Sequence, residues 1–379
     1  MATIRMPSPA LAAANPLQHS PIKRPDRCPH CNALRLIKKG TREKKLERIP
    51  ILRCLSCGRS FTVGPRPIRN KTYPVNEILE ALTLYNRGYS LEETARKISS
   101  RFGRHAAPST VARWLAEYPS FTTYTRLRAR GHALYKPMQT SPTIKLYHRQ
   151  VYEFGWHRSK LAFVRSGTLD DKRVVDKAFA GVADFVESIP TTCPHDLFRR
   201  DDGARGSELL AGFVELDNLI VVEKQNAATE MATLVVPATG SNFERHSKLQ
   251  RFLLTNDSTT IAVEVPIWLD EEEITFLESK YGRQIVPKEP LSPNDPDGPH
   301  KARHLTGHID FLQVRNGALH VLDYKPAART EKPIAQLTIY ALALTVRVPG
   351  LKLFDIKCAW FNEERYCEFF PRKLFPLVR

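Results

Sequence analysis

The sequence predicts an α/β protein with a mixed β-sheet in its C-terminal part, preceded by two small N-terminal units. Three observations support this prediction. Helical and strand patterns alternate after residue 240, two C-x-x-C pairs lie near the N-terminus, and three short helical stretches lie between these regions. A chain of 379 residues is long enough for two or three domains of ordinary size.

The C-terminal region, residues 241–379, has the clearest pattern. "FERHSKLQRFLL" has helical spacing, "TTIAVEVPIWL" has strand spacing, and Asn316-Gly317 within "HLTGHIDFLQVRNGALHVLDYKP" predicts a hairpin turn. "EKPIAQLTIYALALTV" follows as an amphipathic helix, and a strand pair surrounds Glu363-Glu364. The expected order is therefore helix, three strands, helix and strand pair. The apolar face of the second helix is formed by Ile334, Leu337, Ala341 and Leu344.

The two C-x-x-C pairs are separated by 22 residues in a segment rich in Lys and Arg. Two such loops provide four thiolates, which suit tetrahedral Zn²⁺. Two disulfides are the alternative, but nothing marks the chain as secreted. We therefore predict a zinc ribbon over residues 26–70, with a structural ion that stabilises a segment too small to bury its own core. The ligands are Cys28, Cys31, Cys54 and Cys57, whereas Cys193, Cys358 and Cys367 lack this spacing and are expected in the core or at the surface.

Residues 71–120 contain the three helical stretches. The first ends at Gly88, Ser90 and Glu93 predict a capping box at the start of the second, and Ser109 is expected to cap the third. In the third, Val111, Trp114 and Leu115 are expected to point inward, and Thr110, Arg113 and Glu117 to stay free. Such segments also arise from packing alone, but the basic flanks favour a helix-turn-helix whose last helix enters the major groove. The expected DNA contacts are Ser109, Thr110, Arg113, Lys44 and Lys45.

The residues "CPHC", "RCLSCGRSFT" and "YSLEETARKI" to "APSTVARWLAEY" resemble the N-terminal ribbon and helix-turn-helix of transposases. The resemblance covers about the first 120 residues and implies recognition of specific DNA, such as the ends of a mobile element. The carboxylate triad of transposases is not apparent further along the sequence. The inference from this resemblance is therefore limited to binding.

The positive charge is concentrated in the first part of the chain. Residues 1–150 hold 28 Lys and Arg against 8 Asp and Glu, whereas residues 151–379 hold 29 against 32. The net charge of +17 thus arises from the N-terminal part, as expected if that part docks on a polyanion. A solvated basic surface is the alternative, but the motifs favour double-stranded DNA as the partner.

The remaining segments are less informative. Residues 1–25 are rich in Pro and Ala and indicate a disordered tail rather than a signal peptide. No apolar run approaches the roughly 18 residues of a membrane span, so we expect no membrane partner and a cytoplasmic, nucleoid-associated protein. Residues 121–240 are expected to combine a linker with the first part of the last domain. Within them, "TIKLYHRQVYEFGWHRSKLAFV" fits the cover of a core better than a phosphate-tracking strand.

Asp310, Asp323 and Lys325 lie on the two strands of the predicted hairpin. Antiparallel pairing about the turn brings the strands side by side, and two neighbouring carboxylates repel unless a cation or a proton intervenes. They form a natural Mg²⁺ or Mn²⁺ site. Lys325 projects to the same side as Asp323, where it can hold the attacking water or offset transition-state charge. A salt-bridge cluster within the hairpin is the alternative.

This D-x₁₂-D-x-K pattern, continued by Gln336 and Tyr340 on one helical face, resembles the RecB-like branch of the PD-(D/E)xK nucleases. The resemblance covers roughly residues 240–370 and implies a restriction-endonuclease-like core that hydrolyses phosphodiester bonds with a metal ion. It also implies a metal-binding histidine on the preceding helix, matched by His246, and an acidic residue on the next strand, matched by Glu264. His300, His304 and His308 lie in the same region and compete with His246. Ile309 stands where many members have Pro.

We therefore expect a Mg²⁺-dependent deoxyribonuclease. Asp310 and Asp323 bind the metal with His246, Lys325 assists the attacking water, and Gln336 orients Lys325 or the substrate, while Tyr340 lines the cleft. Analogy alone adds a role at mobile-element ends beside a separate transposase. The alternatives are a non-catalytic DNA-binding regulator with an inert nuclease fold and an RNA-processing nuclease.

Overall fold

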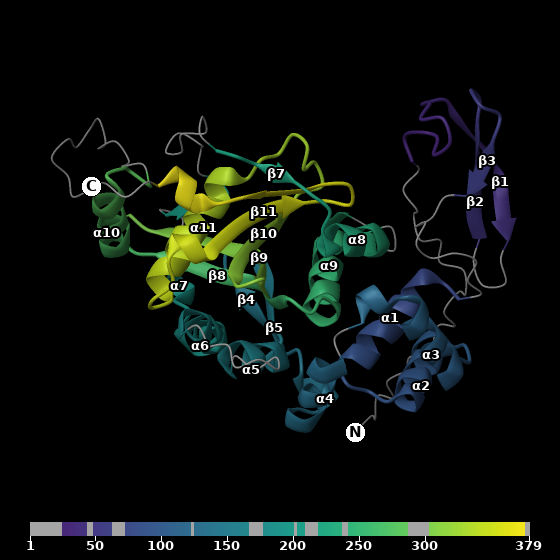
Figure 1. Cartoon of the computed structure of the whole chain (residues 1–379), viewed down its shortest axis with the longest axis horizontal. Coiled ribbons are helices and arrows are strands. Elements are labelled where there is room, and N and C mark those ends of the chain that lie inside the picture. The colour runs from purple at the N-terminus through teal and green to yellow at the C-terminus, as the bar shows by residue number, and fades with distance from the viewer. Residues whose placement is uncertain are drawn as a thin grey trace, which may run out of the picture.

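The computed structural model describes residues 25–43, 48–62, 73–122, 125–166, 177–200, 203–208, 219–236, 242–286 and 303–375. The predicted tail, apart from residue 25, and the candidate DNA contacts Lys44 and Lys45 lie outside these ranges. Within them the chain forms a small N-terminal sheet, a unit of three helices and a large α/β domain (Figure 1).

The small sheet is antiparallel, with strand order β1-β2-β3. Its strands are β1 (Leu36–Glu43), β2 (Arg48–Cys54) and β3 (Ser60–Thr62). Its buried cluster contains only two aliphatic side chains, Leu36 and Leu52, beside the cysteines Cys28 and Cys54. The free energy gained by burying so few side chains is too small to offset the conformational entropy lost when this segment is ordered. A further cross-link is therefore needed.

The helical unit consists of α1 (Val75–Asn86), α2 (Leu91–Phe102) and α3 (Pro108–Glu117). The predicted capping box is present, because the Glu93 amide donates to Ser90 Oγ at 3.1 Å and the Ser90 amide donates to Glu93 Oε2 at 2.9 Å. The predicted cap of the third helix is wrong. Ala107 occupies the N-cap position and Pro108 starts α3, because the fixed φ of proline suits the first helical position.

The large sheet has nine strands in the order β4-β5-β8-β9-β10-β11-β12-β7, with β6 paired to β9. It is mixed, because β10 runs parallel to β11 and β6 parallel to β9, whereas the other pairs are antiparallel. The strands are β4 (Thr143–Tyr147), β5 (Val151–Trp156), β6 (Ala204–Arg205), β7 (Val222–Glu223), β8 (Thr260–Leu269), β9 (Leu305–Arg315), β10 (Ala318–Tyr324), β11 (Ile356–Phe361) and β12 (Tyr366–Phe369).

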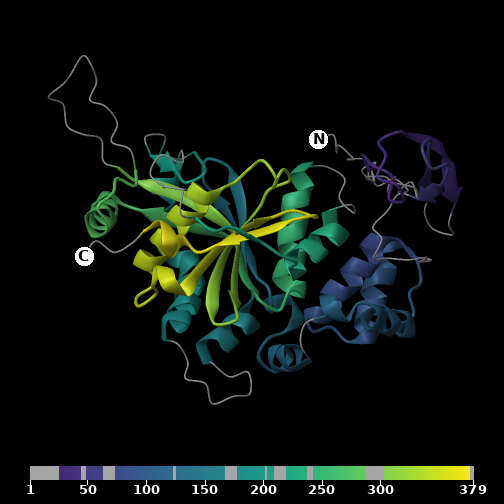
Figure 2. The same ribbon diagram turned by 45° about the horizontal axis from the view of Figure 1, so that its top comes forward.

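Helices cover both faces of this sheet (Figures 1 and 2). They are α5 (Arg158–Ser166), α6 (Lys177–Thr192), α7 (His195–Arg199), α8 (Ala227–Val235), α9 (Asn242–Asn256), α10 (Glu271–Tyr281) and α11 (Ile334–Arg347), whereas α4 (Thr125–Leu134) packs against α5 and the three-helix unit. One core joins α5, α6, α10 and α11 to the sheet, and a second core joins α8 and α9 to it. Short 3-10 helices span Pro119–Phe121, Pro137–Gln139, Leu353–Asp355 and Pro371–Leu374.

The second core continues into the three-helix unit. Ile78 and Leu82 of α1 belong to the same buried cluster as Leu253 of α9. Buried polar groups reinforce this contact, since Asn86 Nδ2 donates to Asn256 Oδ1 at 2.6 Å and Asn256 Nδ2 donates to Thr83 Oγ1 at 3.0 Å. The three-helix unit is therefore packed against the sheet domain through α9.

The order of elements predicted for the C-terminal region is confirmed, with one addition. α9, β8, β9, β10, α11, β11 and β12 follow in sequence, and Asn316-Gly317 forms the turn between β9 and β10. The sequence analysis missed α10, which lies between β8 and β9. It also gave no order for residues 121–240, which supply β4, β5, β6 and β7 of the large sheet. Within this stretch, "EMATLVV" is helical and belongs to α8.

Among the described residues, no helix combines the length and the apolar character that a membrane crossing requires.

Candidate functional site

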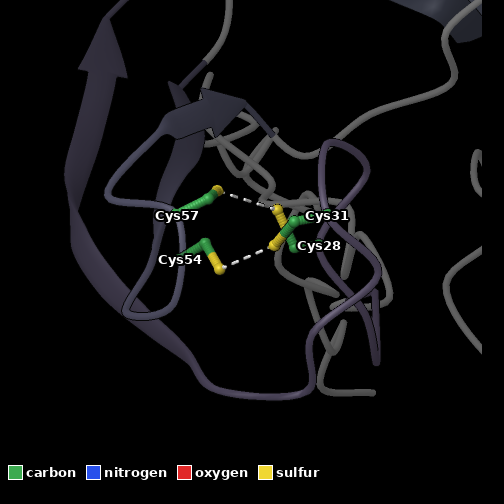
Figure 3. A group of neighbouring side chains, drawn as sticks. All are labelled: Cys28, Cys31, Cys54 and Cys57. Atoms are coloured by element: carbon green, nitrogen blue, oxygen red, sulfur yellow. Dashed lines mark hydrogen bonds between the residues drawn. The ribbon is translucent and has the colours of Figure 1, made fainter.

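The four predicted zinc ligands converge beside the small sheet (Figure 3). Their Sγ atoms all lie within 4.8 Å of one another, with Cys28 to Cys57 at 3.7 Å and Cys31 to Cys54 at 3.5 Å. Tetrahedral zinc with Zn–S bonds of about 2.3 Å separates its sulfurs by about 3.8 Å. All seven cysteines are free, so the alternative of two disulfides is not realised. The cluster fits a structural zinc ion.

Three acidic residues lie in a row across three adjacent strands of the large sheet. The register pairs Val263 with Phe311 and Val265 with Ile309, which places Glu264 of β8 opposite Asp310 of β9. The hairpin register pairs Phe311 with Leu322, which places Asp310 opposite Asp323 of β10. All three side chains are buried. Adjacent buried carboxylates cannot all carry a charge without a nearby cation.

His246 of α9 lies over this row. Its Nε2 is 2.8 Å from Asp310 Oδ2, and its Nδ1 is 3.7 Å from Glu264 Oε1. Asp310 Oδ2 also accepts from the backbone amide of Tyr324 at 2.9 Å. One ligand atom from each of His246, Glu264 and Asp310 lies within 4.8 Å of the others, so the three side chains form a set that can hold a metal ion.

Glu264 adopts an unusual backbone conformation. Its φ is 50°, although it lies in the middle of β8 and is not glycine. Such conformations cost about 1–3 kcal/mol and persist only where the surrounding structure enforces them. Gln250, one helical turn after His246, donates from Nε2 to Glu264 Oε1 at 2.6 Å and so fixes the carboxylate.

Asp323 is paired with Lys325, whose Nζ lies 3.0 Å from Asp323 Oδ2. The salt bridge that is the alternative to a metal site in this hairpin is therefore present. It is not isolated, however, because Asp323 adjoins Asp310 and the wider carboxylate row. Lys325 is only half-buried and lies on the wall of a cavity.

The pKa values show how protons divide among these groups in the absence of a metal ion. Burial raises the pKa of Glu264 to about 7 and raises the pKa of Asp323 well above its usual range, and the charge of Asp310 adds to both shifts. Burial has the same tendency at Asp310, but His246 outweighs it and lowers the pKa to about 2. Burial opposes protonation of His246, but Asp310 and Glu264 raise its pKa to about 9. The row therefore favours positive charge beside it, which His246 supplies.

The residues predicted to form the nuclease site lie around one cavity of about 390 Å³. His246, Glu264, Asp310, Asp323, Lys325, Gln336 and Tyr340 all line it. Gln336 Nε2 is 3.4 Å from Tyr340 Oη, as expected for neighbours on one face of α11. Tyr340 is also buried by packing, since a Cβ on Gly307 would lie 2.4 Å from its ring. Only glycine permits this close approach at position 307.

The candidate DNA contacts on α3 differ in exposure. Ser109 and Arg113 are exposed and Thr110 is half-buried. The buried side chains of this helix are Val111 and Trp114, as predicted, with Leu115 packed at the edge of the same core.

Several cavity residues were missed by the sequence analysis. Arg205 reaches the wall because β6 pairs with β9, and His148, Arg149 and Tyr152 come from the β4–β5 hairpin. His308, named only as a competitor of His246, lines the cavity two residues before Asp310. Gln250, which holds the Glu264 carboxylate, was also missed, although its helical spacing after His246 was a local signal for it.

The described structure thus contains a four-cysteine cluster beside a small antiparallel sheet and a mixed α/β domain with a cavity lined by a row of carboxylates and by basic side chains. In comparisons with models of known protein families, with curated proteins and with solved structures, no match to the chain is found.

Proposed function

We propose that the chain is a metal-dependent DNA nuclease whose large domain is of the RecB-like PD-(D/E)xK type. The observation that supports this most strongly is the convergence of Glu264, Asp310 and Asp323 from three adjacent strands, with Lys325 and His246, on one cavity. Carboxylates and a lysine in this relation are the groups that metal-assisted phosphodiester hydrolysis requires.

The donor set suits a divalent ion. Asp310 and Glu264 offer oxygen ligands for Mg²⁺, and the imidazole of His246 makes Mn²⁺ equally suitable. Asp323, expected from the sequence as a ligand together with Asp310 and His246, adjoins Asp310, and Glu264 stands in the compact donor set in its place. A bound ion would lower the pKa of a water ligand and polarise a phosphoryl oxygen.

Lys325 acts as a cation rather than as a base in this proposal. Burial favours its neutral form, but the neighbouring Asp323 outweighs burial and raises the pKa of Lys325. The ammonium group therefore stays charged at neutral pH, where it orients the attacking water or stabilises charge that develops on the phosphate. Gln336 and Tyr340 line the same cavity, where Gln336 orients Lys325 or the substrate.

The N-terminal units supply DNA binding in the same proposal. The zinc ribbon and the helix-turn-helix place Ser109, Thr110 and Arg113 of α3 against double-stranded DNA, and the excess of Lys and Arg in residues 1–150 attracts the phosphates. By analogy with transposases, we extend the proposal to cleavage at the ends of a mobile element beside a separate transposase.

The decisive experiment compares supercoiled and linear DNA incubated with the full-length protein and Mg²⁺, Mn²⁺ or chelator. We expect cleavage with either ion, and a loss of at least about 100-fold for Asp310→Asn and for Asp323→Asn. DNA binding, measured by mobility shift in Ca²⁺, should stay close to wild type because the three-helix unit is unchanged. Asp184→Asn, at an exposed carboxylate of α6, is the matched control and should cut normally.

Three results would contradict the proposed function. Unchanged activity in both aspartate variants would mean that the cavity is not the active site. Binding without cleavage under every metal condition would favour the DNA-binding regulator. Preferred cleavage of a matched RNA would favour the RNA-processing nuclease.

A further inference from the structure

A second group of metal-ligating side chains lies at the edge of the same cavity. It consists of His148, in the turn between β4 and β5, Cys193, which follows α6, and His195, the first residue of α7. One ligand atom from each lies within 4.8 Å of the others. His148 Nε2 and His195 Nδ1 are 3.1 Å apart. The residues come from three elements, and nothing in the proposed nuclease chemistry requires them.

Backbone geometry brings the last two residues together. The amide of His195 donates to the carbonyl of Cys193 at 2.9 Å, across Pro194, which forms a tight turn. A Cys-x-His spacing in such a turn directs both side chains toward one point. His148 approaches this point from the β4–β5 hairpin.

The ring of His148 is held in one orientation. Its Nδ1 is 2.8 Å from His308 Nε2, and Phe198 stacks on it with ring centres 4.0 Å apart. His308 is itself stacked against Tyr152 at 3.6 Å. Histidines that bind metals usually engage their second nitrogen in such a hydrogen bond, which fixes the tautomer and leaves the other nitrogen free for the ion.

We propose that His148, Cys193 and His195 bind a zinc ion, separate from the ion of the four-cysteine cluster. Two imidazoles and a thiolate suit Zn²⁺ and do not suit Mg²⁺ or Ca²⁺, which prefer oxygen ligands. The nitrogens of a tetrahedral zinc site lie about 3.3 Å apart, close to the distance between His148 and His195. Three protein ligands leave the fourth position for water.

Through its three ligands, this ion connects the β4–β5 turn to the junction of α6 and α7. His148 and Phe198 belong to the wall of the cavity, so the ion stabilises that wall from outside. The alternative is a metal-free chain of hydrogen-bonded histidines, running from His308 through His148 to His195. The two arrangements differ in metal content, which can be measured directly.

The test is the zinc content of the full-length protein after dialysis against zinc-free buffer that contains Mg²⁺. We expect about two zinc ions per chain in the wild type, one for each thiolate-bearing cluster, and about one in Cys193→Ser and in His195→Ala. His105→Ala, at an exposed histidine outside the cluster, is the matched control and should keep both ions. Asp310→Asn should also keep both, which excludes zinc bound by the carboxylates.

A zinc X-ray absorption spectrum of the wild type gives a second readout that does not depend on any variant being folded. Scattering from imidazole nitrogen beside sulfur is expected, whereas an all-sulfur spectrum belongs to the four-cysteine cluster alone. The proposal is overturned by about one zinc per chain in the wild type, by an all-sulfur spectrum, or by a second ion lost in Asp310→Asn and kept in Cys193→Ser.

Discussion

At the scale of single residues, two features fix the carboxylate of Glu264: the positive φ of its backbone and the hydrogen bond that Gln250 Nε2 donates to its Oε1. Its place on the strand after the His246 helix was expected from the resemblance to RecB-like nucleases, and both residues do line the cavity. Its positive φ and its hydrogen bond from Gln250 were not expected, because they depend on how β8 and α9 pack together. Asp310, Asp323 and Lys325 were easier to find, since a hairpin with a strong turn signal brings them together locally.

His157 is a buried residue whose titration the sequence could not have revealed. It precedes α5, where its Nδ1 accepts from the Lys160 amide at 3.4 Å, and its buried Nε2 has no hydrogen-bond partner among the residues that the structure describes. Burial, assisted by the charges of Lys160 and Arg87, lowers its pKa well below the usual value. The folded state therefore keeps His157 neutral while the unfolded chain takes up a proton below about pH 6.5.

From this we predict that His157→Asn makes the protein less sensitive to mild acid. A lowered folded-state pKa means that the unfolded state binds more protons below about pH 6.5, so wild-type stability falls as the pH decreases through this range. Asparagine retains a capping oxygen for the start of α5 and does not titrate. Between pH 6.5 and 5, wild type should lose about 1–2 kcal/mol more than the variant, measured by urea unfolding. An equal loss in both proteins would contradict the prediction, and His105→Asn serves as the control.

At the scale of elements, strands with short-range partners were predictable and those with distant partners were not. β9 and β10 pair across a two-residue turn, whereas the β4–β5 hairpin joins the sheet through the pairing of β5 with β8, about 100 residues further along the chain. α10 has an Asp270–Glu273 capping box, a local signal comparable to that of α2, but it lies between two strands that were expected to follow each other directly. No local sequence pattern predicts the contact between α1 and α9.

The contact between α1 and α9 is expected to couple two buried asparagines energetically. Asn86 is bonded to Asn256 at 2.6 Å and to the Phe121 carbonyl at 2.9 Å, and both asparagines are buried. Removing one partner leaves the other without its bond in a buried site, which costs about 1–3 kcal/mol. A double-mutant cycle of Asn86→Ala and Asn256→Ala, followed by urea unfolding, should therefore give a coupling energy of about 1 kcal/mol.

The matched control for this cycle pairs Asn86→Ala with Asn362→Ala. Asn362 is also buried, but it bonds to Pro326 and to the turn between β11 and β12. These two changes should be additive to within about 0.5 kcal/mol. Additivity in the Asn86–Asn256 cycle as well would show that the two helices do not depend on this bond.

At the scale of the whole molecule, the three-helix unit and the sheet domain share one buried cluster. The sequence motifs change at about residue 120, and a domain boundary was therefore predicted there. Hydrophobic patterning reports which face of a helix is buried but not which partner buries it. α9 carries His246 in its first half and bonds to α1 through Asn256, its last residue, so the proposed DNA-binding helices and the candidate active site rest on the same element.

A shared core predicts that both parts unfold together. The chain has four tryptophans, of which Trp114 lies in α3 while Trp156, Trp268 and Trp360 lie in the sheet domain. Incorporation of 5-fluorotryptophan gives each a separate ¹⁹F resonance, and Trp114→Phe identifies that of α3. In a urea titration all four native resonances should disappear at one midpoint, because separating the units would expose the apolar contacts between α1 and α9. Loss of the Trp114 signal at lower urea, with the other three still native, would show instead that the three helices form an independent domain.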